Sequence, residues 1–141
     1  MSNLEKFIAG YIACAIWSSN DEKTDGGGEP LDANYSADDL SEETLAAMHI
    51  DCKAFAYVNS SAIESGGEGY LGTQRGNDFS EGRWNAYEQA GHDFWLTRNG
   101  HGCGFSDGDW PEPQATTLDR SAEAFGEFHL YVGDDERIYH V

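Results

Sequence analysis

Residue types that could do chemistry gather in one segment, Gly91–Trp110 (GHDFWLTRNGHGCGFSDGDW). The segment holds imidazole, carboxylate and thiol groups, which serve in metal ligation and in acid–base catalysis. These groups belong to His92, Asp93, His101, Cys103, Asp107 and Asp109. With Trp95, the residues His92, Asp93 and His101 could form the site of a small enzyme or ligand-binding protein, and this is the alternative hypothesis for the function.

The turn signal inside this segment argues against a shared active centre. Asn99-Gly100 is typical of a two-residue hairpin turn, so we predict two strands, HDFWLTR and HGCGFSD. In that register His92 faces Asp107 at one end, His101 lies at the turn, and Cys103 points into an apolar face. Because the groups do not converge, we predict no catalytic residue, no metal and no cofactor.

The same register places Trp95 on the other face of the hairpin, against Gly104 and next to the pair of Thr97 with Gly102. An indole beside two glycines would make a flat shelf, covered by the chain itself or by a partner. Self-association into a homodimer through this shelf is a further hypothesis.

Signatures of other reactions are missing from the sequence. The segment GTQRGND lacks the Gly-Lys-Ser/Thr ending of a phosphate-binding loop, and no G-x-S-x-G elbow occurs. His129 and His140 are interpreted as polar residues at a sheet edge. Cys14 and Cys52 fall on apolar helix stripes and are expected to be inert core residues. The sequence therefore favours a binding protein over an enzyme.

The strongest feature of the composition is its charge. The chain has 26 Asp and Glu against 8 Lys and Arg, a net charge of −18 in 141 residues. Such a field repels nucleic acid and anionic membranes and attracts basic protein surfaces. The same excess of carboxylates would also arise if it only keeps the protein soluble, or if the source organism is adapted to salt.

The acidic residues form three clusters along the chain. The first comprises Asp21, Glu22, Asp25, Glu29, Asp32, Asp38, Asp39, Glu42 and Glu43; the second Asp107, Asp109 and Glu112; the third Asp134, Asp135 and Glu136. An acidic surface that competes with DNA needs carboxylates spread over a wide face, with aromatic side chains that bury area. We therefore predict that a partner contacts Asp21, Glu22, Asp38, Asp39, Glu42, Asp107, Asp109 and Trp110.

Helices that would position these groups are predicted in the first half of the chain. Apolar residues recur at helical spacing from Leu4 to Ile16. A second helix is expected to begin after Ser41, a favoured capping residue, and to reach about Asn59. The segments 18–35 and 65–80 are rich in glycine and are expected to be loops, the first of them acidic.

Two more helices and a second hairpin are predicted in the second half. One helix should run from about Glu81 to Ala90, with Ser80 as its cap and Gly91 as its stop, and another from Thr116 or Thr117 to Phe125. In the second hairpin, formed by FHLYV and RIYHV, we expect Val132 to pair with Ile138 and Tyr131 with Tyr139, and Glu136 to occupy the bulge position.

These elements predict a single domain over residues 1–141 with an α+β fold. The N-terminal helices would pack on an antiparallel sheet of about four strands, built from the two C-terminal hairpins with a helix between them. The apolar stretch 7–17 is too short for a membrane span and lacks the basic start of a signal peptide. Three widely spaced cysteines fit reduced thiols in a cytoplasm.

The segment GHDFWLTRNGHGCGF, followed by LDRSAEAFGEFHLYVGDDERIY, resembles small proteins of bacteriophages and prophages. The N-terminal IWSSNDE and GEPLDANYSADDLS are similar to the same group, so the resemblance covers most of the chain and is clearest over Gly91–Tyr139. This family has no established catalytic motif, and no active-site residue carries over. The resemblance implies a phage or mobile-element protein that acts in the cytoplasm of a bacterial host.

Small acidic phage proteins include inhibitors of host defence, among them anti-CRISPR and anti-restriction proteins. By that association we expect a non-enzymatic inhibitor that acts as a DNA mimic. Its partner would be a basic host protein or ribonucleoprotein complex, such as a CRISPR effector, and it would bind neither nucleic acid nor membrane itself.

Overall fold

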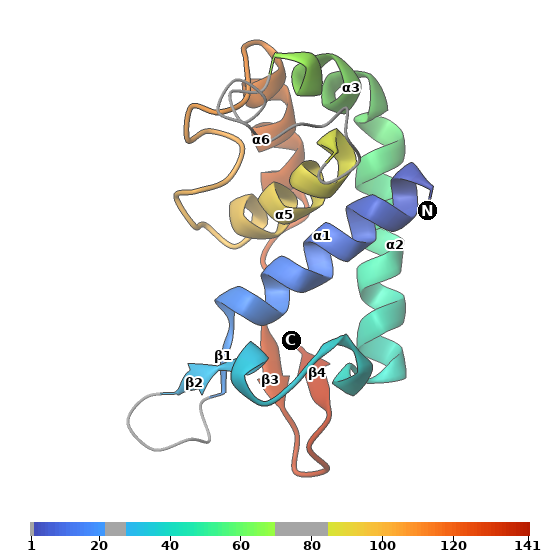
Figure 1. The fold of residues 1–141 in the computed structure, drawn as a ribbon, viewed down its shortest axis with the longest axis vertical. Helices are drawn as coiled ribbons and strands as arrows, with labels where there is room; N and C mark the ends of the chain where they lie inside the picture. Colours follow the sequence, from blue (N-terminus) through green and yellow to red (C-terminus); the bar gives the residue numbers. More distant parts are fainter. Residues whose placement is uncertain (1, 22–27, 70–84) are drawn as a thin grey trace.

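The computed structural model, which describes residues 2–21, 28–69 and 85–141, is built mainly of helices (Figure 1). The helices are α1 (Asn3–Ser18), α2 (Glu42–Val58), α3 (Ser60–Glu68), α5 (Ala86–Arg98) and α6 (Gln114–Ala124), with the short 3-10 helices η1 (Leu31–Ala33) and η2 (Ala37–Asp39). Two antiparallel strand pairs join β1 (Asn20–Asp21) to β2 (Glu29–Pro30) and β3 (Leu130–Val132) to β4 (Ile138–His140). The expected α+β fold with a four-stranded sheet is therefore wrong.

The segment predicted as the first hairpin forms α5 and the loop after it. Most of α5 is buried on every side, so no alternation of apolar and polar residues marks it as helix or strand. Asn99 ends the helix and Gly100 follows with a φ of +76°. The N–H groups of Gly100 and His101 donate to the carbonyls of Thr97 and Leu96, which is a Schellman helix ending. Asn-Gly therefore caps a helix here and turns no hairpin.

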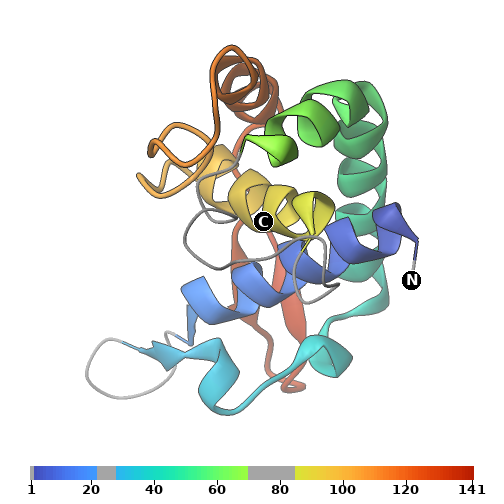
Figure 2. The same cartoon turned by 45° about the horizontal axis from the view of Figure 1, so that its top comes forward.

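Gly91, predicted to stop a helix, lies inside α5 at the point where α1 crosses it (Figure 2). A Cβ atom on Gly91 would lie 2.0 Å from the carbonyl oxygen of Phe7, and one on Gly10 would lie 2.1 Å from that of Glu88. Only glycine lets two backbones approach this closely. The contact between α1 and α5 forms the centre of the core, with α2 packed against α1 and with α3 and α6 against α5.

The helix boundaries agree with the sequence where a capping residue marks them. Ser2 caps α1 and Ser41 caps α2, so both predicted helices are confirmed, although α2 ends at Val58 and α3 begins at Ser60. The start of α5 is capped by Asn85, whereas the predicted cap and first residues, 80–84, lie outside the described residues. Helix α6 begins at Gln114, before the predicted threonines.

The predicted register of the second hairpin is confirmed. Val132 pairs with Ile138 and Tyr131 with Tyr139. Glu136 lies in the turn with a φ of +62°, a conformation that favours glycine. The hairpin is held against the start of α2, because the N–H of Ser41 donates to the carbonyl of Ile138 at 2.9 Å.

A buried cation joins the helical core. Arg98 is 5% exposed and donates hydrogen bonds to Asp51 and to the Tyr11 hydroxyl, both at 2.9 Å. It also donates to the carbonyls of Phe125 and Gly126, at 3.2 and 2.8 Å, just beyond α6. Its guanidinium carbon lies 5.2–5.7 Å from the ring centroids of Phe94, Phe125 and Phe128. Because these groups come from α1, α2, α5 and the end of α6, Arg98 fixes how the helices meet.

Candidate functional site

Carboxylates from three separate segments meet at one end of the molecule, which we call the acidic end. The segments are η2, the first turn of α2, and the turn between β3 and β4, which lie together at the bottom of Figure 1. The acidic end consists of Asp38, Asp39, Glu42, Glu43, Asp134, Asp135 and Glu136. The parallel bridge between Leu40 and Ile138 brings the three segments together.

Local chemistry explains why acidic residues occur at the two helix starts. The N–H of Ser36 donates to the carboxylate of Asp39 at 2.9 Å, and the Ser36 hydroxyl accepts from the N–H of Asp38 at 3.3 Å, so η2 begins with a capping box. Glu42 and Glu43 occupy the first turn of α2, where the helix dipole favours negative charge. The carboxylates thus stabilise the helices that display them.

Few cations offset these charges. Within the three segments, all of which the structure describes, Arg137 is the one Lys or Arg, and it donates to the carbonyl of Leu40 at 3.4 Å. The Tyr139 hydroxyl donates to Asp135 at 2.6 Å, and this bond lowers the pKa of Asp135, aided by the N–H of Arg137. The same bond raises the pKa of Tyr139, to which the charge of Glu43 also contributes. The acidic end therefore stays ionised at neutral pH.

The other predicted contact residues lie elsewhere. Asp107 and Asp109 belong to the loop between α5 and α6, at the opposite end from η2 in both views (Figures 1 and 2). Asp21 and Trp110 are buried, at 6% and 3% exposure. Glu22 lies outside the described residues. The structure thus brings together Asp38, Asp39 and Glu42 of the predicted set, and it adds the hairpin carboxylates to them.

Asp93 takes a structural position in the loop that follows α5. Its carboxylate is 3% exposed and accepts from Trp110 Nε1 at 2.6 Å and from Gln89 Nε2 at 3.0 Å. His92 Nδ1 lies 3.1 Å from the same carboxylate. These bonds fix the indole of Trp110 under the loop, so the predicted pairing of His92 with Asp107 across a hairpin is wrong.

Trp95 is also a core residue. It is 2% exposed, and its Nε1 donates to the Ser18 hydroxyl at 2.7 Å. The predicted shelf beside two glycines is therefore wrong, because it depended on the hairpin register that α5 replaces. The expected burial of Cys14 and Cys52 is confirmed, and burial raises the pKa of Cys14 to about 12. Cys103, expected in an apolar face, is exposed.

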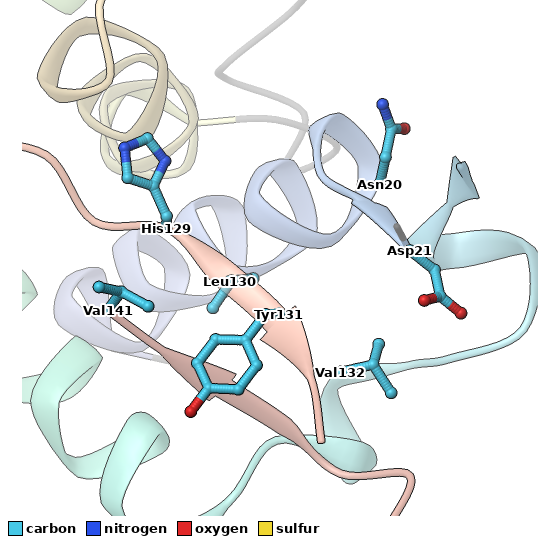
Figure 3. A pocket seen from close by; sticks show the side chains of 7 residues that line it. All are labelled: Asn20, Asp21, His129, Leu130, Tyr131, Val132 and Val141. Carbon is cyan, nitrogen blue, oxygen red and sulfur yellow. The ribbon is translucent and has the colours of Figure 1, made fainter. Parts of the chain in front are cut away.

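A polar pocket that sequence reasoning missed lies between β1 and β3 (Figure 3). It has a volume of about 400 Å³ and is lined by Asn20, Asp21, His129, Leu130, Tyr131, Val132 and Val141. An adjoining pocket of about 290 Å³ shares Asn20, His129 and Leu130, and it adds Trp95 and His101 from the predicted ligand site. No local pattern could reveal this pocket, because it depends on the contact between two strands far apart in the sequence.

The chemistry available in these pockets is limited. Two imidazoles, from His101 and His129, border the smaller pocket, and His129 Nε2 lies 3.1 Å from Glu127. Across the described ranges, no three His, Cys, Asp or Glu side chains are grouped so that they could hold a metal ion. The arrangement fits hydrogen bonding to a small polar ligand.

Comparison of the chain with protein-family descriptions, with curated proteins and with solved structures finds no match. Among the described residues, no helix has the length and apolar character that a membrane crossing requires.

Proposed function

We propose that the protein is a non-enzymatic, phage-encoded inhibitor of host defence that binds a basic protein surface through its acidic end. The observation that carries this proposal is the meeting of seven carboxylates from three segments beside Arg137. The partner would be a host complex that handles nucleic acid, such as a CRISPR effector, and the inhibitor would act in the host cytoplasm. The phage origin rests on the resemblance of Gly91–Tyr139 to phage proteins.

The physical basis is competition for a basic groove. Duplex DNA presents about one negative charge per 1.7 Å of its axis, and its binding proteins meet that charge with Lys and Arg. The acidic end offers closely spaced carboxylates to the same side chains. Association of this kind is fast and falls steeply with ionic strength. Asp38, Asp39 and Glu42 are kept as contact residues, and Asp107 with Asp109 forms a separate patch.

Charge reversal at the acidic end tests the proposal. The variant Asp38→Lys/Glu42→Lys/Glu43→Lys leaves the bond from Ser36 to Asp39 in place. We expect it to lose inhibition of DNA binding by purified CRISPR effector complexes, measured with a fluorescent target duplex. For the unchanged protein, inhibition at 50 mM NaCl should weaken at least tenfold by about 300 mM NaCl.

A matched control reverses three acidic residues at the opposite end. Glu68→Lys/Asp119→Lys/Glu123→Lys makes the same change in net charge on α3 and α6 and should keep full inhibition. Thermal unfolding of both variants verifies that each is folded. Retained inhibition by the acidic-end variant would reject the proposal, and the pocket beside Trp95, His101 and His129 would then become the first site to examine for a small-ligand function.

A further inference from the structure

Helix α1 carries two apolar stripes, and the core uses one of them. Phe7, Tyr11 and Ala15 are fully buried in the core. The second stripe, also at helical spacing, consists of Ala9, Ile12, Ala13, Ile16 and Trp17. Ala9 and Ala13 are not buried, and Trp17 is 58% exposed. A helix with an apolar side of this kind left partly open needs a partner for it.

The second stripe forms one wall of a groove of about 630 Å³. The opposite wall is the segment 32–37, which contributes Asp32, Tyr35, Ser36 and Ala37. Polar side chains in the lining come from this wall, whereas the α1 wall is built of alanine, isoleucine and tryptophan. Because η2 begins at Ala37, the groove leads directly to the acidic end.

The charges around the groove favour a basic occupant. Asp32 lines the groove, and the carboxylate of Asp39 is held against the wall by the N–H of Ser36 at 2.9 Å. At the other end of α1, Glu5 and Lys6 offset each other. A second copy of this chain would bring a further charge of −18 to an acidic surface, so like-charge repulsion disfavours it.

We propose that the groove holds the apolar face of a basic amphipathic helix from the partner, an inference that rests on the proposed function. Small residues at Ala9 and Ala13 let a second helix approach α1, and Ile12, Ile16 and Trp17 give its apolar side chains a surface to cover. Lys and Arg residues beside that stripe would meet Asp32 and Asp39. The interface then has an apolar centre with an acidic rim, which is the usual anatomy of a protein contact.

Two synthetic peptides test this directly. Both contain the same Leu and Lys residues, so their charge is equal, but one places Leu at helical i, i+3, i+4, i+7 spacing and the other distributes Leu around the helix. We expect the first peptide to bind the full chain about tenfold more tightly in fluorescence anisotropy at 150 mM NaCl. The variant Ala13→Arg should abolish that difference, and Ala9→Arg serves as a second variant if Ala13→Arg does not fold.

The matched control is Ala54→Arg, at an exposed alanine of α2, which should keep the tenfold difference. Equal affinity of the two peptides for the unchanged protein, or a difference that survives Ala13→Arg, overturns the inference. Dimerisation in sedimentation that Ala13→Arg abolishes would assign the groove to a second copy and would also overturn it.

The same peptides separate this inference from the proposed function. Asp38→Lys/Glu42→Lys/Glu43→Lys should weaken both peptides by a similar factor, because both carry the same charge. If both bind this variant as tightly as the unchanged protein, the proposed role of the acidic end fails. If both weaken but never differ from each other, only the groove inference fails.

Discussion

Among single residues, Arg98 has the most demanding environment. A buried guanidinium is tolerated only when its donors are satisfied, and here they reach a carboxylate, a phenol and two carbonyls. Burial raises the pKa of Tyr11, which keeps the phenol neutral as one of these partners. No pattern in the sequence indicates this network, because Arg in the segment LTRNG is as compatible with an exposed strand as with a buried helix end.

Replacing Arg98 by Met should destabilise the fold strongly. Asp51 and two backbone carbonyls would lose their partner, and a loss of about 3–5 kcal/mol in the free energy of unfolding is expected. Urea denaturation followed by circular dichroism measures it. Arg120→Met, at an exposed position of α6, should change stability by less than about 0.5 kcal/mol. A loss below about 1 kcal/mol for Arg98→Met would show that the network is not needed for the fold.

At the scale of elements, local signals predicted what local chemistry determines. Capping serines marked α1 and α2, and the hairpin register followed from the pairing of Tyr131 with Tyr139. Helix α5 was missed because its residues are buried all round and because Asn99-Gly100 suits a helix ending as well as a hairpin turn. Only the crossing of α1 at Gly91 decides between the two, and that contact is tertiary.

The turn of the second hairpin contains a testable strain at Glu136. A non-glycine residue with a φ of +62° costs about 1–2 kcal/mol, partly offset in the comparison with Gly by the greater entropy of an unfolded Gly. Glu136→Gly should therefore stabilise the protein by about 0.5–1 kcal/mol in urea denaturation. Asp134→Gly, at a neighbouring residue without a positive φ, should be neutral or destabilising. Equal effects of both changes would argue against strain at Glu136.

For the candidate site, the sequence predicted which residues are acidic but not where they lie in space. The grouping of Asp38, Asp39 and Glu42 depends on local helix starts, and it could be anticipated. The addition of residues 134–136 and the separation of Asp107 and Asp109 depend on how the hairpin docks, which no spacing in the sequence encodes. The groove along α1 likewise requires the segment 32–37 to fold back on the helix.

On the scale of the whole molecule, a net charge of −18 repels itself in the compact state. Raising NaCl from 0.05 to 0.5 M shortens the range of this repulsion, and the melting temperature should rise by about 5 °C. The variant Asp38→Lys/Glu42→Lys/Glu43→Lys, with a net charge of about −12, should gain less. A protein that unfolds unless salt approaches about 1 M would instead support a salt-adapted source as the reason for its charge.

The docking of the C-terminal hairpin has a consequence for synthesis. Arg137 and Leu40, which touch at the acidic end, are 97 residues apart in the chain. A growing polypeptide on the ribosome holds only the helix-start carboxylates until its final strands emerge and dock beside Leu40. The concentrated field thus comes into existence at the last step of folding, and an incomplete chain would present a weaker decoy to basic proteins nearby.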